Sequence, residues 1–165
     1  MGIMPKKLIT LSIGVSSSKM EFTKWYGPGG IEQYIVEQTG CKPYSGAGIN
    51  PRQDTKTTIL KSVDGTEYYD DDMSDINNPQ YTLFGHNGDQ DENEKRFNEP
   101  LLNRTKTEHI YLYRVQKDGK RTKYIWYGKY EIVEKIRKEH PGKDRNLRTI
   151  VVLRLKKLNP TNLLD

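Results

Sequence analysis

Residues 68–90 read YYDDDMSDINNPQYTLFGHNGDQ and combine aromatic rings with carboxylates. Tyr69 and Tyr81 lie twelve residues apart around Asp70, Asp71 and Asp72, and a loop containing Gly, His and Asn follows. Two rings and a carboxylate suit a pocket for a flat, polar ligand such as a nucleobase. The rings can stack on its faces while the carboxylate accepts a hydrogen bond from an exocyclic amine. The alternative is a solvated acidic turn between two strands, with tyrosines that only pack.

Charge is distributed unevenly along the chain, whose formal net charge is +5. From Asp64 to Glu99 there are 11 acidic and 2 basic residues, whereas from Arg104 to Lys157 there are 17 basic and 6 acidic residues. The basic part suits contacts with phosphates. The alternative is that the acidic and basic segments neutralise each other within the fold.

Composition indicates a single domain whose core is small or partly built from tyrosine. Hydrophobic residues make up 33% of the 165 residues, below the usual share of about 45–50%, and 11 tyrosines stand against 3 phenylalanines. The single cysteine, Cys41, excludes an internal disulfide and a cysteine-based zinc cluster. We expect a cytoplasmic protein, because no apolar run is long enough for a membrane span and the N-terminus lacks the features of a signal peptide.

Hydrophobic periodicity predicts a mainly β protein of the α+β class, built as a curved sheet or barrel with one or two flanking helices. The expected strands are residues 7–15, 56–63, 109–115, 123–136 and 148–158. Helices are expected over 29–38 and 89–103, the second bent or ended by Pro100. Residues 40–54 are expected to form a loop, and turns are expected at 64–65, 117–120 and 140–143.

Catalytic motifs are absent from the sequence. His86, His109 and His140 lack metal-ligand spacing, and neither a nucleophile elbow nor a phosphate-binding loop occurs. A magnesium site at Asp70–Asp72 with Asp75 is disfavoured, because adjacent side chains on a strand point to opposite faces. We therefore expect a binding protein without a metal or cofactor, rather than an enzyme.

Several motifs, in order, resemble those of the SRA (SET- and RING-associated, or YDG) domain, which flips modified cytosine out of duplex DNA. The matching pieces are GAGIN at 46–50 followed by Arg52, YDDD at 69–72, YT at 81–82, DQ at 89–90, Asn98 with Leu101, and YGKYEI at 127–132. The resemblance covers residues 44–158 and implies a PUA/SRA-like fold. Residues 1–43 would then be an N-terminal strand and helix extension, and 159–165 a tail or linker.

The resemblance also assigns roles to individual residues. Tyr69 and Tyr81 would enclose the flipped base, Asp72 would accept a hydrogen bond from the cytosine N4 amine, and Thr82 would help to close the pocket. Phe84, although it differs from the family, lies in the same loop and is included among the pocket residues. The loop formed by Gly46, Ala47, Gly48, Ile49 and Asn50, with Arg52, would approach the DNA. Candidate phosphate contacts in the basic part are Lys106, Arg114, Lys123 and Lys129.

The compact form resembles prokaryotic SRA domains of modification-dependent restriction endonucleases. The sequence therefore predicts a module that binds duplex DNA carrying 5-methylcytosine or 5-hydroxymethylcytosine, with a nuclease domain or subunit as its partner. Leu83 and Phe84 replace smaller residues of the family's pocket loop, and Gly46 replaces a larger one. Three alternatives therefore stay open: the same fold reading methyladenine, a glucosylated base or a phosphorothioate; a PUA-like module that binds RNA or protein; and a compact nuclease.

Overall fold

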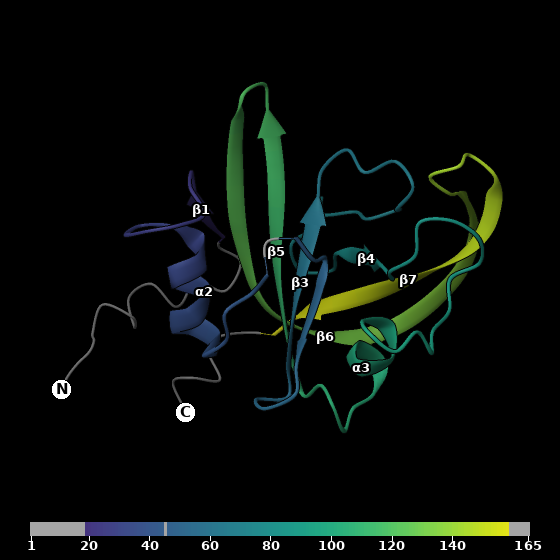
Figure 1. Cartoon of the computed structure of the whole chain (residues 1–165), viewed down its shortest axis with the longest axis horizontal. Coiled ribbons are helices and arrows are strands. Elements are labelled where there is room, and N and C mark those ends of the chain that lie inside the picture. The colour runs from purple at the N-terminus through teal and green to yellow at the C-terminus, as the bar shows by residue number, and fades with distance from the viewer. Residues whose placement is uncertain (1–18, 45, 159–165) are drawn as a thin grey trace.

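An open, mixed β-sheet forms the framework of the chain (Figure 1). The computed structural model describes residues 19–44 and 46–158. Its strands run in the order β2-β3-β5-β6-β7-β4, with β1 paired to β6. The elements are β1 (Met20–Phe22), α2 (Ile31–Thr39), β2 (Ile49–Arg52), β3 (Thr57–Val63), β4 (Gln80–Thr82), α3 (Asn98–Leu102), β5 (His109–Asp118), β6 (Arg121–Pro141) and β7 (Leu147–Lys157).

Strand β6 gives the sheet its curvature. Its first part pairs with β5 and β1, and the rest pairs with β7. The β5–β6 register shifts between Leu112 and Tyr113 of β5, and the β6–β7 register shifts between Ile132 and Glu134 of β6. Such bulges bend a strand and increase its twist. Figure 1 accordingly shows the β5–β6 hairpin standing upright while the β6–β7 pair curves away to one side. Of the two architectures expected, the curved sheet is confirmed, and the sheet does not close into a barrel.

The sheet is buried on both faces in its centre. On β5, Ile110 and Leu112 belong to the larger core, which lies under the segment that carries β4 and α3. Tyr111 and Tyr113, on the opposite face, pack in a second core under α2. The alternation of these four residues therefore follows the two-residue period of a strand. Tyrosine supplies much of the apolar area, as the composition predicted, because Tyr113, Tyr127 and Tyr130 are fully buried.

A parallel pair, β3 and β5, determines how the rest of the chain must run. Parallel neighbours cannot be joined by a tight hairpin, so the chain needs a long crossover between them. Residues 64–108 form this crossover, which reaches the far edge of the sheet, where β4 pairs with β7. Most of the acidic residues lie in this crossover.

Most of the predicted elements are confirmed, and two are wrong. Helix α2 and strands β3, β5, β6 and β7 lie where periodicity predicted them, and the β5–β6 turn is centred on Gly119. The helix expected over 89–103 shrinks to α3, and Pro100 lies inside its first turn, where a helix needs no N–H donor. The loop expected over 40–54 contains β2, and three-residue strands β1 and β4 were not predicted. The strand expected over 7–15 lies outside the described residues.

Residues 89–97 avoid a helix because other groups satisfy their backbone. The Gln90 N–H donates to the Thr149 carbonyl of β7, and the Asp89 carboxylate accepts from the Thr149 N–H. Further along, the Glu94 carboxylate accepts from three backbone N–H groups, those of Arg96, Phe97 and Asn98. Such local side-chain bonds compete with helix formation.

A loop of residues 83–88, the pocket loop, leaves β7 at Leu83 and returns to it at Asp89. Gln90 holds its base: the side-chain amide donates to the carbonyls of Leu83 (2.7 Å) and Gly85 (3.1 Å) and accepts from the Val151 N–H (2.9 Å). Asn98, which is fully buried, accepts from the Phe84 N–H and donates to the Phe84 carbonyl.

Arg148 completes the attachment of the pocket loop. Arg148 is 4% exposed, and its guanidinium donates to the carbonyls of Gly85 and Tyr68, each at 2.5 Å. One side chain thus joins the pocket loop to the segment before Tyr69. A rigid loop follows, because its backbone groups have fixed partners in the sheet and in α3.

We predict that Gln90→Ala lowers the free energy of unfolding by about 2–4 kcal/mol, because a buried N–H and a carbonyl lose their partners and each costs about 1–3 kcal/mol. Urea denaturation measures the change. The matched control is Gln53→Ala in the exposed β2–β3 turn, which should change stability by less than about 0.5 kcal/mol. Equal effects of the two substitutions would contradict the role given to Gln90.

Candidate functional site

A cavity of about 300 Å³ opens between the pocket loop, the start of β2 and the segment 66–71. We call it the tyrosine cavity. Its backbone rim is the Gly46–Gly48 turn, and its polar groups include the Asp71 carboxylate and Thr82. Its aromatic lining comes from Tyr68, Tyr69, Tyr81, Phe84, His86 and Phe97.

Asp71 is the carboxylate of this cavity. Its two oxygens each accept one hydrogen bond at 2.7 Å, from the Ser62 hydroxyl and from the Thr82 N–H. Burial raises the pKa of Asp71 to about 6, although both hydrogen bonds act to lower it. A carboxylate has about four acceptor positions, so Asp71 keeps capacity for a further donor inside the cavity.

Asp72, which the sequence assigned to the pocket, lies outside the cavity. Its backbone exchanges hydrogen bonds with Gln80 at the start of β4, and its carboxylate is exposed. There it accepts hydrogen bonds from the N–H and hydroxyl of Ser74, which lower its pKa. Neighbouring side chains in an extended segment alternate in direction. With Asp71 facing inward, Asp72 points to solvent.

The other four predicted pocket residues line the tyrosine cavity. Tyr81 is 4% exposed, and its hydroxyl lies 2.9 Å from the Gly48 carbonyl and 3.2 Å from that of Lys61. A side chain at Gly48 would crowd this hydroxyl, because a Cβ there would lie 3.3 Å from it. Thr82 accepts from the Asp70 N–H, which ties β4 to the acidic run.

Tyr69 is held more loosely than Tyr81. Its hydroxyl accepts from the Gly85 N–H at 3.3 Å, and burial raises the pKa of this hydroxyl to about 12. Its ring packs edge-on against Tyr68, with centroids 4.9 Å apart. Tyr69 is partly exposed, so a face of its ring can receive a ligand.

Phe84 belongs to an aromatic wall that sequence reasoning found only in part. The Phe84 ring lies 4.8 Å from that of Phe97 and 5.5 Å from that of His86, which in turn lies 5.0 Å from Tyr68. Phe97 comes from the segment before α3 and His86 from the pocket loop. Tyr68 and His86 flank motifs identified in the sequence, but nothing in the sequence pattern placed Phe97 here.

The predicted DNA-contacting loop divides into two parts. Gly46, Ala47, Gly48 and Ile49 line the tyrosine cavity. Asn50 is buried and shapes the turn, because its side chain accepts from the Tyr44 N–H and donates to the Ala47 carbonyl. Arg52 lies away from the cavity, with its guanidinium carbon 5.5 Å from the centre of the Tyr44 ring.

Three of the four predicted phosphate contacts, Arg114, Lys106 and Lys123, already have ionic partners. Arg114 forms two hydrogen bonds with Asp64, at 2.7 and 2.9 Å, and this carboxylate raises the pKa of the guanidinium. Lys106 pairs with Glu99 at 2.6 Å. Lys123 lies 3.9 Å from Glu21, and the Lys129 ammonium lies 5.8 Å from the Tyr111 ring centre.

Ion pairs connect the acidic crossover to the basic strands more widely. Glu92 contacts both Lys135 and Arg137, and Asp70 contacts Lys138. Neutralisation within the fold, one of the two alternatives for the split charge, therefore accounts for part of it. Exposed cations such as Lys143, which lies 5.9 Å from the Tyr68 ring centre, border the tyrosine cavity.

Neither a metal site nor a membrane-spanning helix occurs within residues 19–44 and 46–158. In that part of the chain, no three His, Cys, Asp or Glu side chains gather to form a metal site. Neither of its two helices has the length and apolar character needed to cross a membrane.

Known proteins resemble the chain in structure but not in sequence. No family model and no curated protein matches it. The MspJI restriction endonuclease in complex with a 27-mer oligonucleotide is 14% identical with a TM-score of 0.60, over 93% of this chain and 45% of that one. KRYPTONITE in complex with mCHG DNA is 16% identical with a TM-score of 0.54, over 86% of this chain and 32% of that one.

A third similar structure contains the sulfur-binding and SRA domains of ScoMcrA with phosphorothioated DNA. It is 21% identical with a TM-score of 0.51, over 76% of this chain and 37% of that one. The chain thus spans less than half the length of each of these proteins. At such identities the likeness concerns the fold, and it confirms what the motifs predicted: this chain has the fold of SRA domains and of modification-dependent restriction endonucleases.

Proposed function

We propose that this chain binds duplex DNA carrying a modified cytosine and receives the flipped base in the tyrosine cavity. The observation that carries the proposal is a half-buried carboxylate, Asp71, with unused acceptor capacity inside an aromatic cavity. The chain would act as the recognition part of a modification-dependent restriction system, with the nuclease supplied elsewhere in the protein or by a partner. Neighbours of the same fold include proteins solved with modified DNA, which supports this assignment.

Asp71 takes the role that the sequence gave to Asp72. Cytosine presents an N4 amine, whereas thymine presents an O4 acceptor at the same place. An ionised Asp71 attracts the amine and repels O4, so it selects cytosine and its derivatives. The hydrogen bonds from Ser62 and Thr82 fix the direction of the carboxylate.

Stacking of the base and the rigidity of the pocket loop would offset the free-energy cost of flipping. Flipping a base costs a few kcal/mol, and stacking on an aromatic side chain returns about 1–3 kcal/mol per base. The Tyr69 ring and the wall at Phe84 and His86 supply the stacking surface. Because Gln90, Asn98 and Arg148 hold the pocket loop in place, little further ordering is needed on binding.

Phosphate contacts would supply most of the affinity, as in other proteins that bind DNA. Lys106 and Arg114 are engaged in ion pairs, which makes them weak candidates. Lys143, at the edge of the tyrosine cavity, is a stronger one, and the Gly46–Gly48 turn would lie against the DNA.

A second candidate is recognition of a different mark by the same cavity. The aromatic wall of Phe84, His86 and Phe97 favours it, since these rings extend the lining beyond the two tyrosines and the carboxylate. A larger group on the base, such as a glucosyl substituent, would lie along this wall.

The proposal is tested by fluorescence polarisation at one near-physiological salt concentration, with matched duplexes carrying unmodified, 5-methyl, 5-hydroxymethyl or glucosylated cytosine. We expect at least a several-fold preference for one modified duplex, since burial of one methyl group alone contributes about 0.8 kcal/mol. Preference for the glucosylated duplex would select the second candidate. Equal affinity for all four would sink the proposal.

Asp71→Asn should abolish discrimination between 5-methylcytosine and thymine, which share the methyl group and differ at the N4 or O4 position. We expect the ratio of the two affinities to fall by about tenfold, as for other base contacts worth about 1–3 kcal/mol. The matched control is Asp72→Asn, whose exposed carboxylate should leave the ratio unchanged. If instead only the Asp72 variant lost discrimination, the assignment of Asp71 would be wrong.

Discrimination should also depend on pH. The pKa of Asp71 is about 6, so lowering the pH from 7.5 to 5 protonates it and converts it from an acceptor into a donor that suits thymine O4. The ratio of affinities should therefore fall over this range in the native protein and stay flat in Asp71→Asn. The fall in the affinity ratio would not come from acid unfolding caused by protonation of Asp71. A pKa raised by folding means that protonation through pH 6 increases stability rather than lowering it.

A further inference from the structure

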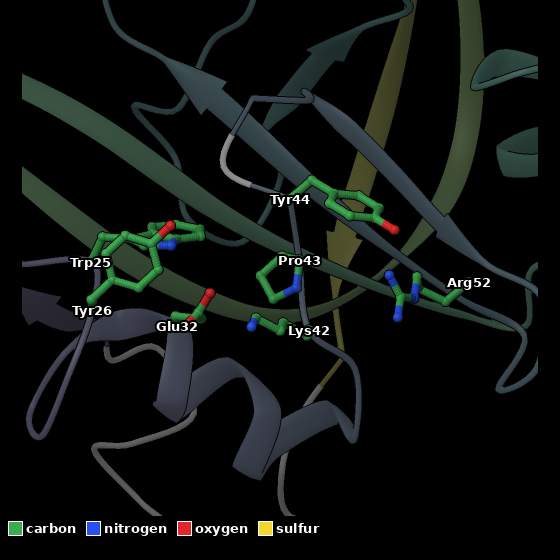
Figure 2. Close-up of a pocket in the computed structure, with 7 residues that line it drawn as sticks. All are labelled: Trp25, Tyr26, Glu32, Lys42, Pro43, Tyr44 and Arg52. Carbon is green, nitrogen blue, oxygen red and sulfur yellow. The ribbon is translucent and has the colours of Figure 1, made fainter.

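A second hollow, of about 350 Å³, lies on the α2 side of the Gly46–Gly48 turn (Figure 2). We call it the Trp25–Tyr44 pocket. Three aromatic side chains, Trp25, Tyr26 and Tyr44, line it together with the charged side chains Glu32, Lys42 and Arg52. Figure 2 shows Glu32 entering from α2, while Tyr44 comes from the loop before β2 and Arg52 from the end of β2.

The aromatic groups of this pocket combine a fixed floor with open rings. Trp25 is 9% exposed and packs against the rings of Tyr113 and Tyr124, at 5.8 and 5.6 Å. Tyr26 and Tyr44 are each 66% exposed. Asn50 anchors the backbone of Tyr44, and Arg52 lies over its ring. Large, ordered, exposed rings next to cations are typical of surfaces that stack nucleobases.

The charges match the parts of a nucleotide. Within the described residues, Lys42, Arg52 and Glu32 form no ion pair with one another or with any other group. The two cations suit a phosphate, and the single carboxylate suits an exocyclic amine of a base.

The pocket is next to the tyrosine cavity. Tyr44 and Gly46 are two residues apart, so their Cα atoms are separated by at most about 7 Å. A further hollow adjoins both sites, because it shares Trp25 and Tyr26 with the pocket and Lys61 and Val63 with the cavity. A DNA strand that enters the tyrosine cavity would therefore continue along this surface.

We propose that the Trp25–Tyr44 pocket binds one unpaired nucleotide, separately from the tyrosine cavity. The base stacks on the open rings of Tyr44 and Tyr26, its exocyclic amine donates to Glu32, and its phosphate contacts Lys42 and Arg52. The site needs no modification of the base. The nucleotide comes either from an unpaired stretch of a DNA strand or from a free mononucleotide.

The first test measures binding of fluorescein-labelled single strands of eight dC or eight dT nucleotides by fluorescence polarisation. Tyr44→Ala should weaken binding of the dC strand by about 5- to 10-fold, near the low end of base stacking on an aromatic side chain. Tyr44→Phe should retain native affinity, because the ring is kept. Tyr44 is exposed, so neither substitution is expected to disturb the fold.

The charged groups give two further measurements. Glu32→Gln should reduce the preference for dC over dT. Arg52→Ala should lower the slope of log affinity against log salt by about 0.7, the value for one lost phosphate contact on a single strand. The matched control, Arg104→Ala, removes an exposed arginine that lines a different hollow beside α3 and should leave the slope unchanged.

Competition with the mononucleotide dCMP distinguishes the two sources. Displacement of the strand by dCMP at concentrations comparable to the strand's own Kd identifies a site for free nucleotides, and its failure identifies a site for a DNA strand. The proposal is overturned if Tyr44→Ala changes the affinity for neither the dC strand nor dCMP. It is also overturned if Arg104→Ala lowers the salt slope as much as Arg52→Ala does.

Asp71→Asn separates this proposal from the one above. It should remove base discrimination in duplex DNA, while the fold-loss of single-strand affinity caused by Tyr44→Ala should be the same in the Asp71→Asn background as in the native protein. If the native protein shows no preference for modified duplexes but Tyr44→Ala weakens single-strand binding, the pocket stands and the proposed function fails. If the native protein prefers a modified duplex but Tyr44→Ala does not weaken single-strand binding, the proposed function stands and the nucleotide site in the Trp25–Tyr44 pocket is rejected.

Discussion

The structure of the tyrosine cavity depends on the hydrogen bonds that hold the pocket loop. Gln90, Asn98 and Arg148 between them bind the carbonyls of Leu83, Phe84 and Gly85, which no neighbouring strand reaches. An unpaired buried carbonyl or N–H is costly, so these three side chains determine whether the loop can exist in this conformation. The conformation of the loop in turn determines where the rings of Phe84 and His86 lie. The side chains that stabilise the loop therefore also position the aromatic rings on this side of the cavity.

The opposite side is built around a carboxylate that the fold disfavours. Burial raises the pKa of Asp71, which means that the ionised form is less stable in the folded chain than in water. A serine or asparagine at this position would avoid that cost. Retaining an acid there makes sense if the carboxylate has a ligand to meet, which is why Asp71 carries more weight in the functional argument than the exposed acids around it.

Sequence reasoning predicted the framework well because strand periodicity is a local signal. The alternation on β5 and the apolar runs of β6 and β7 are visible residue by residue, and the motifs at Tyr69, Tyr81 and Thr82 identified the cavity. It failed where the decision was not local. Helical spacing over 89–103 lost to hydrogen bonds with β7, and three consecutive aspartates gave no indication of which one faces inward. In the sequence, Arg148 could not be distinguished from the other basic residues, because burial of its guanidinium requires carbonyls more than sixty residues away.

The crossover between β3 and β5 has a consequence for how binding specificity can change. Every pocket residue from Tyr68 to Phe97 lies in this one continuous segment, while the strands that it joins pair directly with each other. The sheet is therefore a constant framework, and the crossover is a segment that can be replaced without changing how the strands pair. Insertions, deletions or recombination between residues 64 and 108 could redesign what the cavity accepts, provided that the anchors to β7 were kept. Under the proposed function, one unchanged sheet would then serve for the recognition of different DNA marks.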